Sequence, residues 1–158
     1  MTAQERKKYE AYIRRYYDIY FRMDALYNLW SSANRIQDTT LFVLNEISAQ
    51  ECCTQRSLAS RLGYSKQTIS SALRRLEQGG IISRQRDPMD QRNNLVRLTS
   101  RGRTYAEGLI SRLRDAEVRA FQSWSDQETE QILQAFDQLT GALADSILSD
   151  LQPPPKDP

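Results

Sequence analysis

Apolar residues recur every three or four positions along most of the chain, a spacing that predicts amphipathic helices. The clearest case is the segment 66–78, whose apolar stripe consists of Ile69, Ala72, Leu73 and Leu76. Ser65 precedes this stripe and can cap the helix. A shorter helix is expected to start at Thr54 and to end at Gly63. The two segments predict a pair of helices joined by a tight turn.

Two short runs of apolar and β-branched residues follow, at 81–84 and 94–98. Turn-forming residues occupy the interval 87–93. This pattern predicts a β-hairpin with a basic tip.

Longer helices are expected on both sides of this block. From Ala3 to Trp30, a seam of alternating four- and three-residue spacings contains Tyr9, Ile13, Tyr16, Tyr20, Met23, Tyr27 and Trp30. A second helix is expected at 39–48, with Asp38 as its cap. After the hairpin, Thr99 can cap a third long helix, and Ser125 with Glu128 forms a capping box for a fourth. The seam of the fourth consists of Ile132, Phe136, Leu139, Leu143, Ile147 and Leu151.

Charge is distributed unevenly along the chain. Between Thr54 and Arg103 there are eleven Lys and Arg residues and three carboxylates, a net charge of +8 that leaves −6 for the rest of a chain whose total is +2. One face of the predicted helix 66–78 carries no carboxylate and contains Lys66, Gln67, Ser70, Ser71, Arg74 and Arg75. These groups can donate to base edges and phosphates. A solvated helix face would show the same pattern on this helix alone, but the concentration of arginine favours nucleic-acid binding.

The helix pair is followed by the motifs Leu-Glu-x-x-Gly-x-Ile-x-Arg, Asp-Pro-x-Asp-x-Arg and Leu-Thr-x-x-Gly. Together they resemble the MarR family of winged-helix transcription regulators over residues 54–102. The resemblance implies a mainly α (α+β) fold, a winged helix-turn-helix with a two-stranded wing and long dimerisation helices at both ends. The implied division is 1–36 for the N-terminal dimerisation helix, 37–99 for the DNA-binding lobe, 100–152 for the C-terminal dimerisation helices and 153–158 for a frayed tail.

The function implied is that of a sequence-specific regulator, a repressor that binds a pseudo-palindromic double-stranded DNA operator as a homodimer. The residues expected to contact DNA are Gln55, Arg56, Ser65, Lys66, Gln67, Thr68, Ser70, Ser71, Arg74, Arg75, Arg84, Arg86 and Arg92. Gln67 is expected to read a base in the major groove, and Arg92 to reach the minor groove from the wing tip. An alternative is a winged helix used as a protein-interaction module, which the cationic face disfavours.

A small aromatic or phenolic acid is the expected effector, because family members bind such ligands where the dimerisation helices meet the winged lobe. Here that junction contains Tyr27, Trp30 and Phe42, with Arg35 able to hold a carboxylate. The same aromatic residues could simply fill the space between helices.

The adjacent Cys52 and Cys53 do not form a disulfide framework, which fits a reducing compartment. They are interpreted as small apolar residues, or as part of a short strand that family members pair with the wing. A thiol-based redox sensor is the alternative function.

Histidine is absent, which removes the commonest general base and the commonest zinc ligand. No phosphate-binding glycine loop or soft-ligand cluster accompanies the carboxylates, so we expect no enzyme activity, no metal and no cofactor. No apolar run of membrane-spanning length and no leader pattern occur, so we expect a cytoplasmic protein that does not bind membranes.

Overall fold

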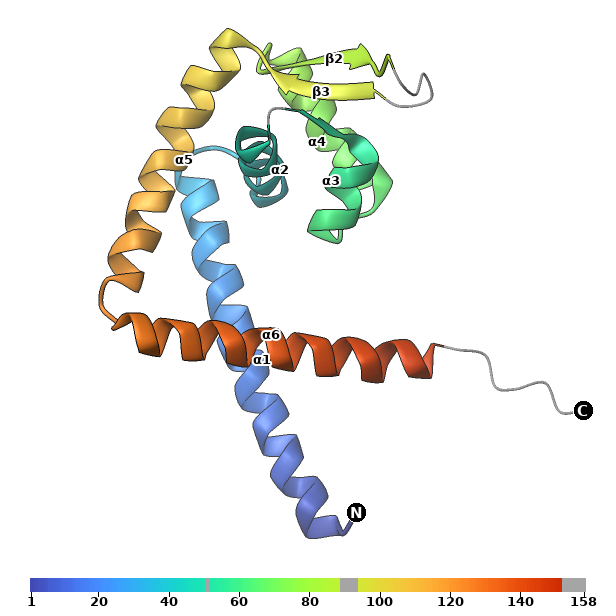
Figure 1. Ribbon diagram of the computed structural model, residues 1–158, viewed down its shortest axis with the longest axis vertical. Helices are drawn as coiled ribbons and strands as arrows, with labels where there is room; N and C mark the ends of the chain where they lie inside the picture. Colours follow the sequence, from blue (N-terminus) through green and yellow to red (C-terminus); the bar gives the residue numbers. More distant parts are fainter. Residues whose placement is uncertain (51, 89–93, 152–158) are drawn as a thin grey trace, which may run out of the picture. The chain divides into compact units, whose positions relative to one another are not determined.

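The computed structural model describes residues 1–50, 52–88 and 94–151. Its elements, labelled in Figure 1, follow in the order α1 (Ala3–Ala33), α2 (Asp38–Ala49), β1 (Cys53–Thr54), α3 (Gln55–Leu62), α4 (Lys66–Gln78), β2 (Ile82–Arg86), β3 (Asn94–Leu98), α5 (Ser100–Phe121) and α6 (Asp126–Asp150). The mainly helical fold with a winged helix-turn-helix and long terminal helices is confirmed.

The chain divides into two compact units, residues 1–111 and 112–158. The first contains α1 to β3 and the beginning of α5. The second contains the remainder of α5 and α6. Within the described residues, no helix is long and apolar enough to cross a membrane.

The core of the first unit lies where α2, α3, α4, the sheet and the start of α5 meet. Its fully buried side chains come mainly from α2 and α4, and the largest of them are Leu41, Leu44, Ile47, Leu58, Ile69 and Leu73. The stripe predicted for 66–78 is buried throughout, so burial of one face fixes how α4 is rotated about its axis.

The wing sheet has three strands in the order β1-β3-β2, all antiparallel. Figure 1 shows β2 and β3 as the projecting hairpin. The third strand, β1, is only two residues long and pairs Cys53 with Val96 and Thr54 with Leu95. The expected two-stranded wing is therefore extended by one strand, as the alternative interpretation of the cysteines allowed.

Most predicted helix ends agree with the structure. Ser65, Thr54 and Ser125 each accept a backbone N–H bond as N-caps. Asp38 does not cap α2: Gln37 holds the cap position without a side-chain bond, and Asp38 is the first helical residue. Its carboxylate instead accepts from the amide of Thr39 at 2.6 Å, in the first turn where negative charge is favourable.

The two terminal helices keep their apolar seams largely outside the core. In α1 only Ser31 is buried, and Tyr20 and Phe21 are 53% and 60% exposed. No residue of α6 is buried, and Phe136 remains 45% exposed. Large apolar side chains left open in this way favour burial by a partner surface.

Candidate nucleic-acid interface

Helix α4 presents the polar face predicted for it. The hydroxyl of Ser65 accepts from the amide of Thr68 at 3.1 Å and starts the helix. With one stripe buried, the exposed side is left to Lys66, Gln67, Ser71, Arg74 and Arg75, while Thr68 and Ser70 are half-buried. These five residues include three cations and no carboxylate, and the exposed Glu77 lies in the last turn of the helix, so the N-terminal part of α4 offers donors to an anionic partner.

The turn before α4 is held in place from two sides. Gly63 has φ of 68°, a left-handed conformation that an L side chain rarely adopts. The next residue, Tyr64, shares a hydrogen bond with Thr39 of α2, and partial burial raises the pKa of its phenol. These constraints fix where α4 begins relative to α2 and α3.

Arg75 lies at the edge of this face. Its Nη2 is 3.5 Å from Oγ1 of the buried Thr40 in α2. Part of its donor capacity is thus directed at the protein, whereas the side chains of Gln67, Ser71 and Arg74 are exposed and make no hydrogen bond to another described residue.

The wing cations differ in exposure. Arg86 is exposed, whereas the side chain of Arg84 is only 22% exposed and its Nε lies 3.1 Å from Oε2 of Glu77 in α4. The Nε of Arg84 is buried. It is close enough to Glu77 for an ion pair, but the two groups are not oriented for a hydrogen bond. The expected contact of Arg92 lies outside the described residues. Arg84 therefore connects β2 to α4 and is not a free surface cation.

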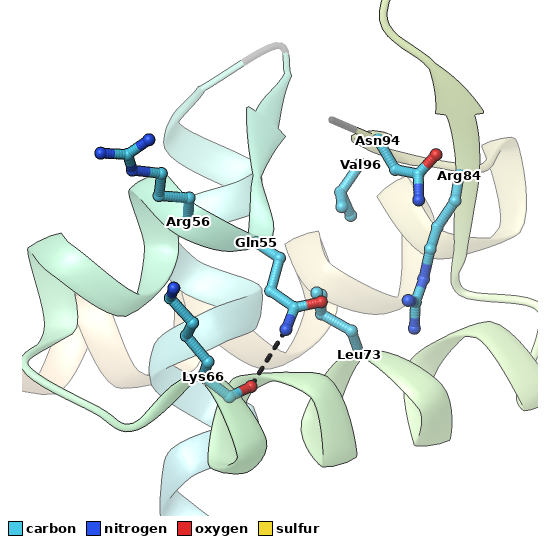
Figure 2. A pocket seen from close by; sticks show the side chains of 7 residues that line it. All are labelled: Gln55, Arg56, Lys66, Leu73, Arg84, Asn94 and Val96. Atoms are coloured by element: carbon cyan, nitrogen blue, oxygen red, sulfur yellow. Dashed lines mark hydrogen bonds between the residues drawn. The ribbon is translucent and has the colours of Figure 1, made fainter. Parts of the chain in front are cut away.

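A polar cavity of about 350 Å³ lies between α3, α4 and the wing (Figure 2). It is lined by Gln55, Arg56, Lys66, Leu73, Arg84, Asn94 and Val96. Asn94, Leu73 and Val96 are not among the predicted contact residues. The alternation of β3 would have indicated Asn94 and Val96, since residues two apart lie on the same face of a strand.

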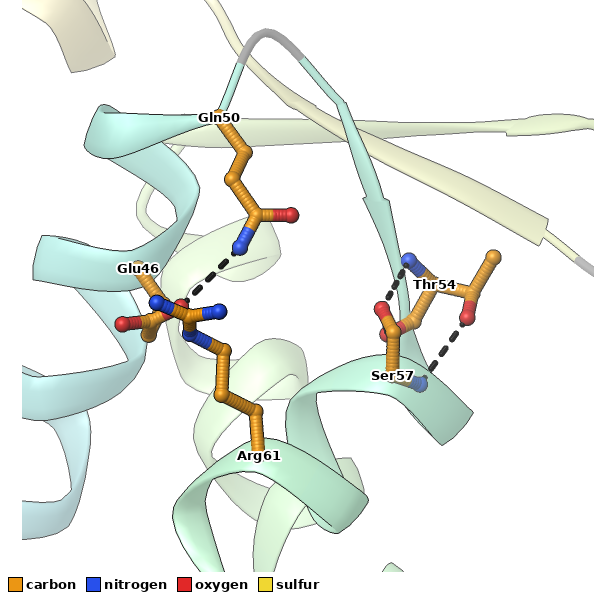
Figure 3. A network of polar contacts seen from close by, with 5 residues as sticks. All are labelled: Glu46, Gln50, Thr54, Ser57 and Arg61. Carbon is orange, nitrogen blue, oxygen red and sulfur yellow. Dashed lines mark hydrogen bonds and ion pairs between the residues drawn. The ribbon is translucent and has the colours of Figure 1, made fainter.

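The start of α3 is fixed by short-range bonds (Figure 3). Thr54 and Ser57 form a reciprocal capping box, with both bonds at 3.0 Å. Arg61 pairs at 2.6 Å with Glu46, whose side chain is 14% exposed and also accepts from Gln50. These bonds attach α3 to α2 and so fix the position of Gln55 and Arg56.

The residues expected to bind an effector are only partly brought together. The rings of Tyr27 and Phe42 contact each other with centroids 5.5 Å apart. Trp30, on the same helix as Tyr27, is half-buried, and Arg35 is exposed with a positive φ of 56°. Ring contact within this group fits the interpretation that the aromatic residues fill space between helices.

Cys53 is buried in β1 and Cys52 is half-buried. Burial raises the pKa of the Cys53 thiol to about 11, with smaller contributions from Cys52 and Glu46. Since the thiolate is the reactive form, Cys53 is a poor nucleophile near neutral pH. Within the described ranges, no three metal-binding side chains cluster together.

Comparison with known proteins agrees with the resemblance found in the sequence. A family model described as the MarR family matches residues 36–93. No curated protein matches the chain.

Solved structures match over most of the chain. A MarR family regulator from Neisseria meningitidis is 20% identical, with a TM-score of 0.78 over 87% of this chain and 97% of that one. The MepR–DNA complex from S. aureus is 24% identical, with a TM-score of 0.70 and coverages of 84% and 97%. A probable transcriptional regulator from Pseudomonas aeruginosa is 27% identical, with a TM-score of 0.62 and coverages of 77% and 93%. The similarity thus extends well beyond the segment that the family model matches.

Proposed function

We propose that the chain is a transcriptional regulator of the MarR family, whose model matches residues 36–93, and that it is a cytoplasmic homodimer that binds a pseudo-palindromic DNA operator and represses transcription. Members of this family are transcription factors and not enzymes, so the expectation of a non-catalytic protein is confirmed. The relative MepR has been crystallised in complex with DNA, which supports the same partner for this chain.

The observation that carries the DNA-binding proposal is the exposed face of α4. Its opposite face is buried to within a few per cent, so Gln67, Ser71 and Arg74 are presented on a rigid element. A helix of this kind fits the major groove, where an amide side chain can bond an adenine and a guanidinium a guanine. Base reading by Gln67 would supply sequence preference, and the cations would supply salt-dependent affinity.

The homodimer proposal rests on the two terminal helices. Each exposes a seam of large apolar residues that its own unit does not cover. Charge favours a pairing between them: α6 contains six carboxylates and no cation, whereas α1 contains six cations and four carboxylates. A second copy of the chain offers both an apolar seam and opposite charge to each helix.

Release by a small aromatic or phenolic acid is the regulatory part of the proposal. The ligand would bind beside Tyr27, Trp30 and Phe42, with Arg35 near its carboxylate. It can release DNA only by binding the DNA-incompetent arrangement of the two lobes more tightly, and a tenfold loss of DNA affinity requires about 1.4 kcal/mol of such preference.

Selection of bound sequences from a random pool of duplex DNA tests the function directly. We expect an inverted repeat whose half-sites are about one helical turn apart, and retention that falls steeply with salt. The matched pair of variants is Arg74→Ala, on the exposed face of α4, and Arg114→Ala, an exposed cation of α5 outside the proposed pairing of α1 with α6. Only the first should weaken binding. No enrichment of any sequence, with retention insensitive to salt, would instead favour the protein-interaction module.

A further inference from the structure

The apolar seam of α1 follows a heptad repeat, and this repeat gives every other residue of the helix a place relative to the seam. The a and d positions are held by Tyr9, Ile13, Tyr16, Tyr20, Met23, Tyr27 and Trp30. In such a repeat the e and g positions flank the seam, where a partner helix would form its ion pairs, and the b, c and f positions face away from it. No Lys or Arg of α1 lies at an e or g position.

The cations of α1 gather on the side away from the seam. Lys8, Arg15 and Arg22 occupy three successive c positions, seven residues apart, and are called the basic row. Two further cations, Lys7 and Arg14, lie at the b positions beside it. All five side chains are exposed. The b, c and f positions of the helix contain one carboxylate, that of Asp18, so this side is strongly positive.

The charges of the basic row have no partner of opposite sign within the chain. The ion pair found in α1 joins Arg6 to Glu10, and no member of the row forms one with another described residue. Arg22 donates to the backbone carbonyl of Asp18 in its own helix at 3.3 Å, which leaves its charge uncompensated. The row is therefore available to an acidic surface.

Helix α6 carries the opposite charge in the same arrangement. Its seam places Phe136 and Leu143 at a positions, which assigns Glu130 and Asp137 to b positions and Asp145 to a c position. These three exposed carboxylates, called the acidic row, form no ion pair with a described residue. Since α6 contains no Lys or Arg, nothing on the helix itself offsets them.

The two rows have matching spacings. Steps of seven residues in the basic row are about 10.5 Å along the helix, and steps of seven and eight in the acidic row are about 10.5 and 12 Å. Side by side, the rows can thus bring all three pairs of charges together. Whether the helices run parallel or antiparallel, the middle pair is the same, Arg15 with Asp137.

We propose that the basic row of α1 docks on the acidic row of α6 in another homodimer, so that two homodimers join through their outward faces. The inference rests on the proposed homodimer and adds a second contact to it, because burial of the seams leaves the b and c positions on the surface. Each dimer carries both rows, so the contact occurs twice across a two-fold axis. The joined dimers carry four copies of α4 and can hold two operators at once.

The energetics of this contact differ from those of the seams. One exposed ion pair contributes little, but here six pairs act together, and salt screens all of them. The contact between homodimers is therefore weak and salt-sensitive. The homodimer, which buries apolar side chains, is not weakened by salt.

Sedimentation equilibrium of the full chain measures the assembly at low and high salt. Near 50 mM NaCl the mass should approach that of four chains at high micromolar concentration. In about 1 M NaCl, where the screening length falls to about 3 Å, the mass should be that of two chains.

Reversal of the middle pair tests the residues. Arg15→Glu should weaken association of the homodimers about tenfold, because one attraction becomes a repulsion in both copies of the contact. Asp137→Arg should have the same effect, and the two changes combined in one chain should restore association. Arg56→Glu, the same change at an exposed position of α3, is the matched control and should leave the mass unchanged. Circular dichroism melting checks that every variant folds.

The outcomes separate this inference from the function on which it rests. A mass of two chains at every concentration and salt would overturn the pairing of homodimers and leave the homodimer intact. A mass of four chains that survives 1 M NaCl, or that ignores Arg15→Glu, would overturn it in favour of an apolar contact. A monomeric mass would be a failure of the proposed homodimer itself, and this inference would fall with it.

Discussion

Gly102 in the first turn of α5 lies directly against the backbone of Ile81, so close that a Cβ at this position would be 1.8 Å from the carbonyl oxygen of Ile81. Thr99 completes the junction: its hydroxyl donates to the carbonyl of Gly80 at 2.8 Å and accepts from the amide of Gly102 at 2.9 Å. These contacts attach the start of α5 to the segment that leads into the wing. The glycine of the Leu-Thr-x-x-Gly motif is thus required by a close approach and not by helix propensity.

Gly102→Ala should therefore destabilise the protein by about 1–3 kcal/mol or more, because the added methyl group forces the helix away from Ile81. The measurement is urea denaturation followed by circular dichroism. Gly108→Ala is the matched control in the same helix. Nothing lies within 4 Å of a Cβ at that position, so it should stabilise by about 0.5–1 kcal/mol. Equal effects of the two substitutions would contradict the role given to Gly102.

Gln67→Ala should relax sequence preference at one base pair by about 1–3 kcal/mol, because the exposed amide near the start of α4 is expected to bond a base edge. Binding to operators with single base changes measures this loss. Gln78→Ala makes the same change at the other end of the helix and should leave the preference as it is. Identical discrimination by wild type and Gln67→Ala at every position would refute the assignment.

Phe136→Lys in the seam of α6 should weaken the homodimer at least tenfold, since burying an aromatic side chain contributes about 1.5–3 kcal/mol in each copy. Light scattering across a concentration series gives the dissociation constant. The control, Gln134→Lys, places the same charge on α6 outside the seam. A wild-type protein of monomeric mass at micromolar concentration would rule out the dimer altogether.

The free energy of unfolding should fall as pH rises from about 9 to about 11. Below that range the Cys53 thiol should not affect it. The pKa of the Cys53 thiol is raised by burial from 9.0 to about 11 in the folded protein. In that window the unfolded chain loses a proton that the folded chain retains, so rising pH favours unfolding. Thermal melting at each pH measures the slope. Cys53→Ala should reduce it, whereas Cys52→Ala should preserve it.

The same burial predicts that Cys53 will not react with peroxide and so will not alter DNA binding, because little Cys53 thiolate exists near neutral pH. Loss of binding after peroxide in the wild type, but not in a Cys52→Ser, Cys53→Ser variant, would support the thiol-sensing alternative.

A salicylate-like acid should quench Trp30 fluorescence if the effector binds as proposed. The only other tryptophan, Trp124, is replaced by Phe so that Trp30 is the sole reporter. Arg35→Ala should abolish the quenching, because it removes the cation that would bind the carboxylate of the ligand. Arg22→Ala should not affect the quenching. DNA affinity unmoved by millimolar ligand would remove the support for this effector.

The sequence alone determined the features that depend on neighbours a few residues apart. The limits of α4 followed from the cap at Ser65 and the stripe to Leu76, and the start of α6 followed from the box of Ser125 and Glu128. Helical periodicity and capping act within one or two turns, so they can be identified from the residues involved. The motifs between Thr54 and Gly102 indicated the resemblance to the MarR family for the same reason: their spacing is local.

Tertiary structure decided the features that join distant segments. The two-residue strand β1 is too short to be predicted from its own residues and exists because Cys53 pairs with Val96. Arg84 resembles any other wing cation in the sequence, yet its register opposite Val96 and the position of Glu77 turn it into the cavity. Whether a side chain is buried, paired or free to meet DNA depends on contacts across long stretches of chain, and local pattern does not specify those contacts.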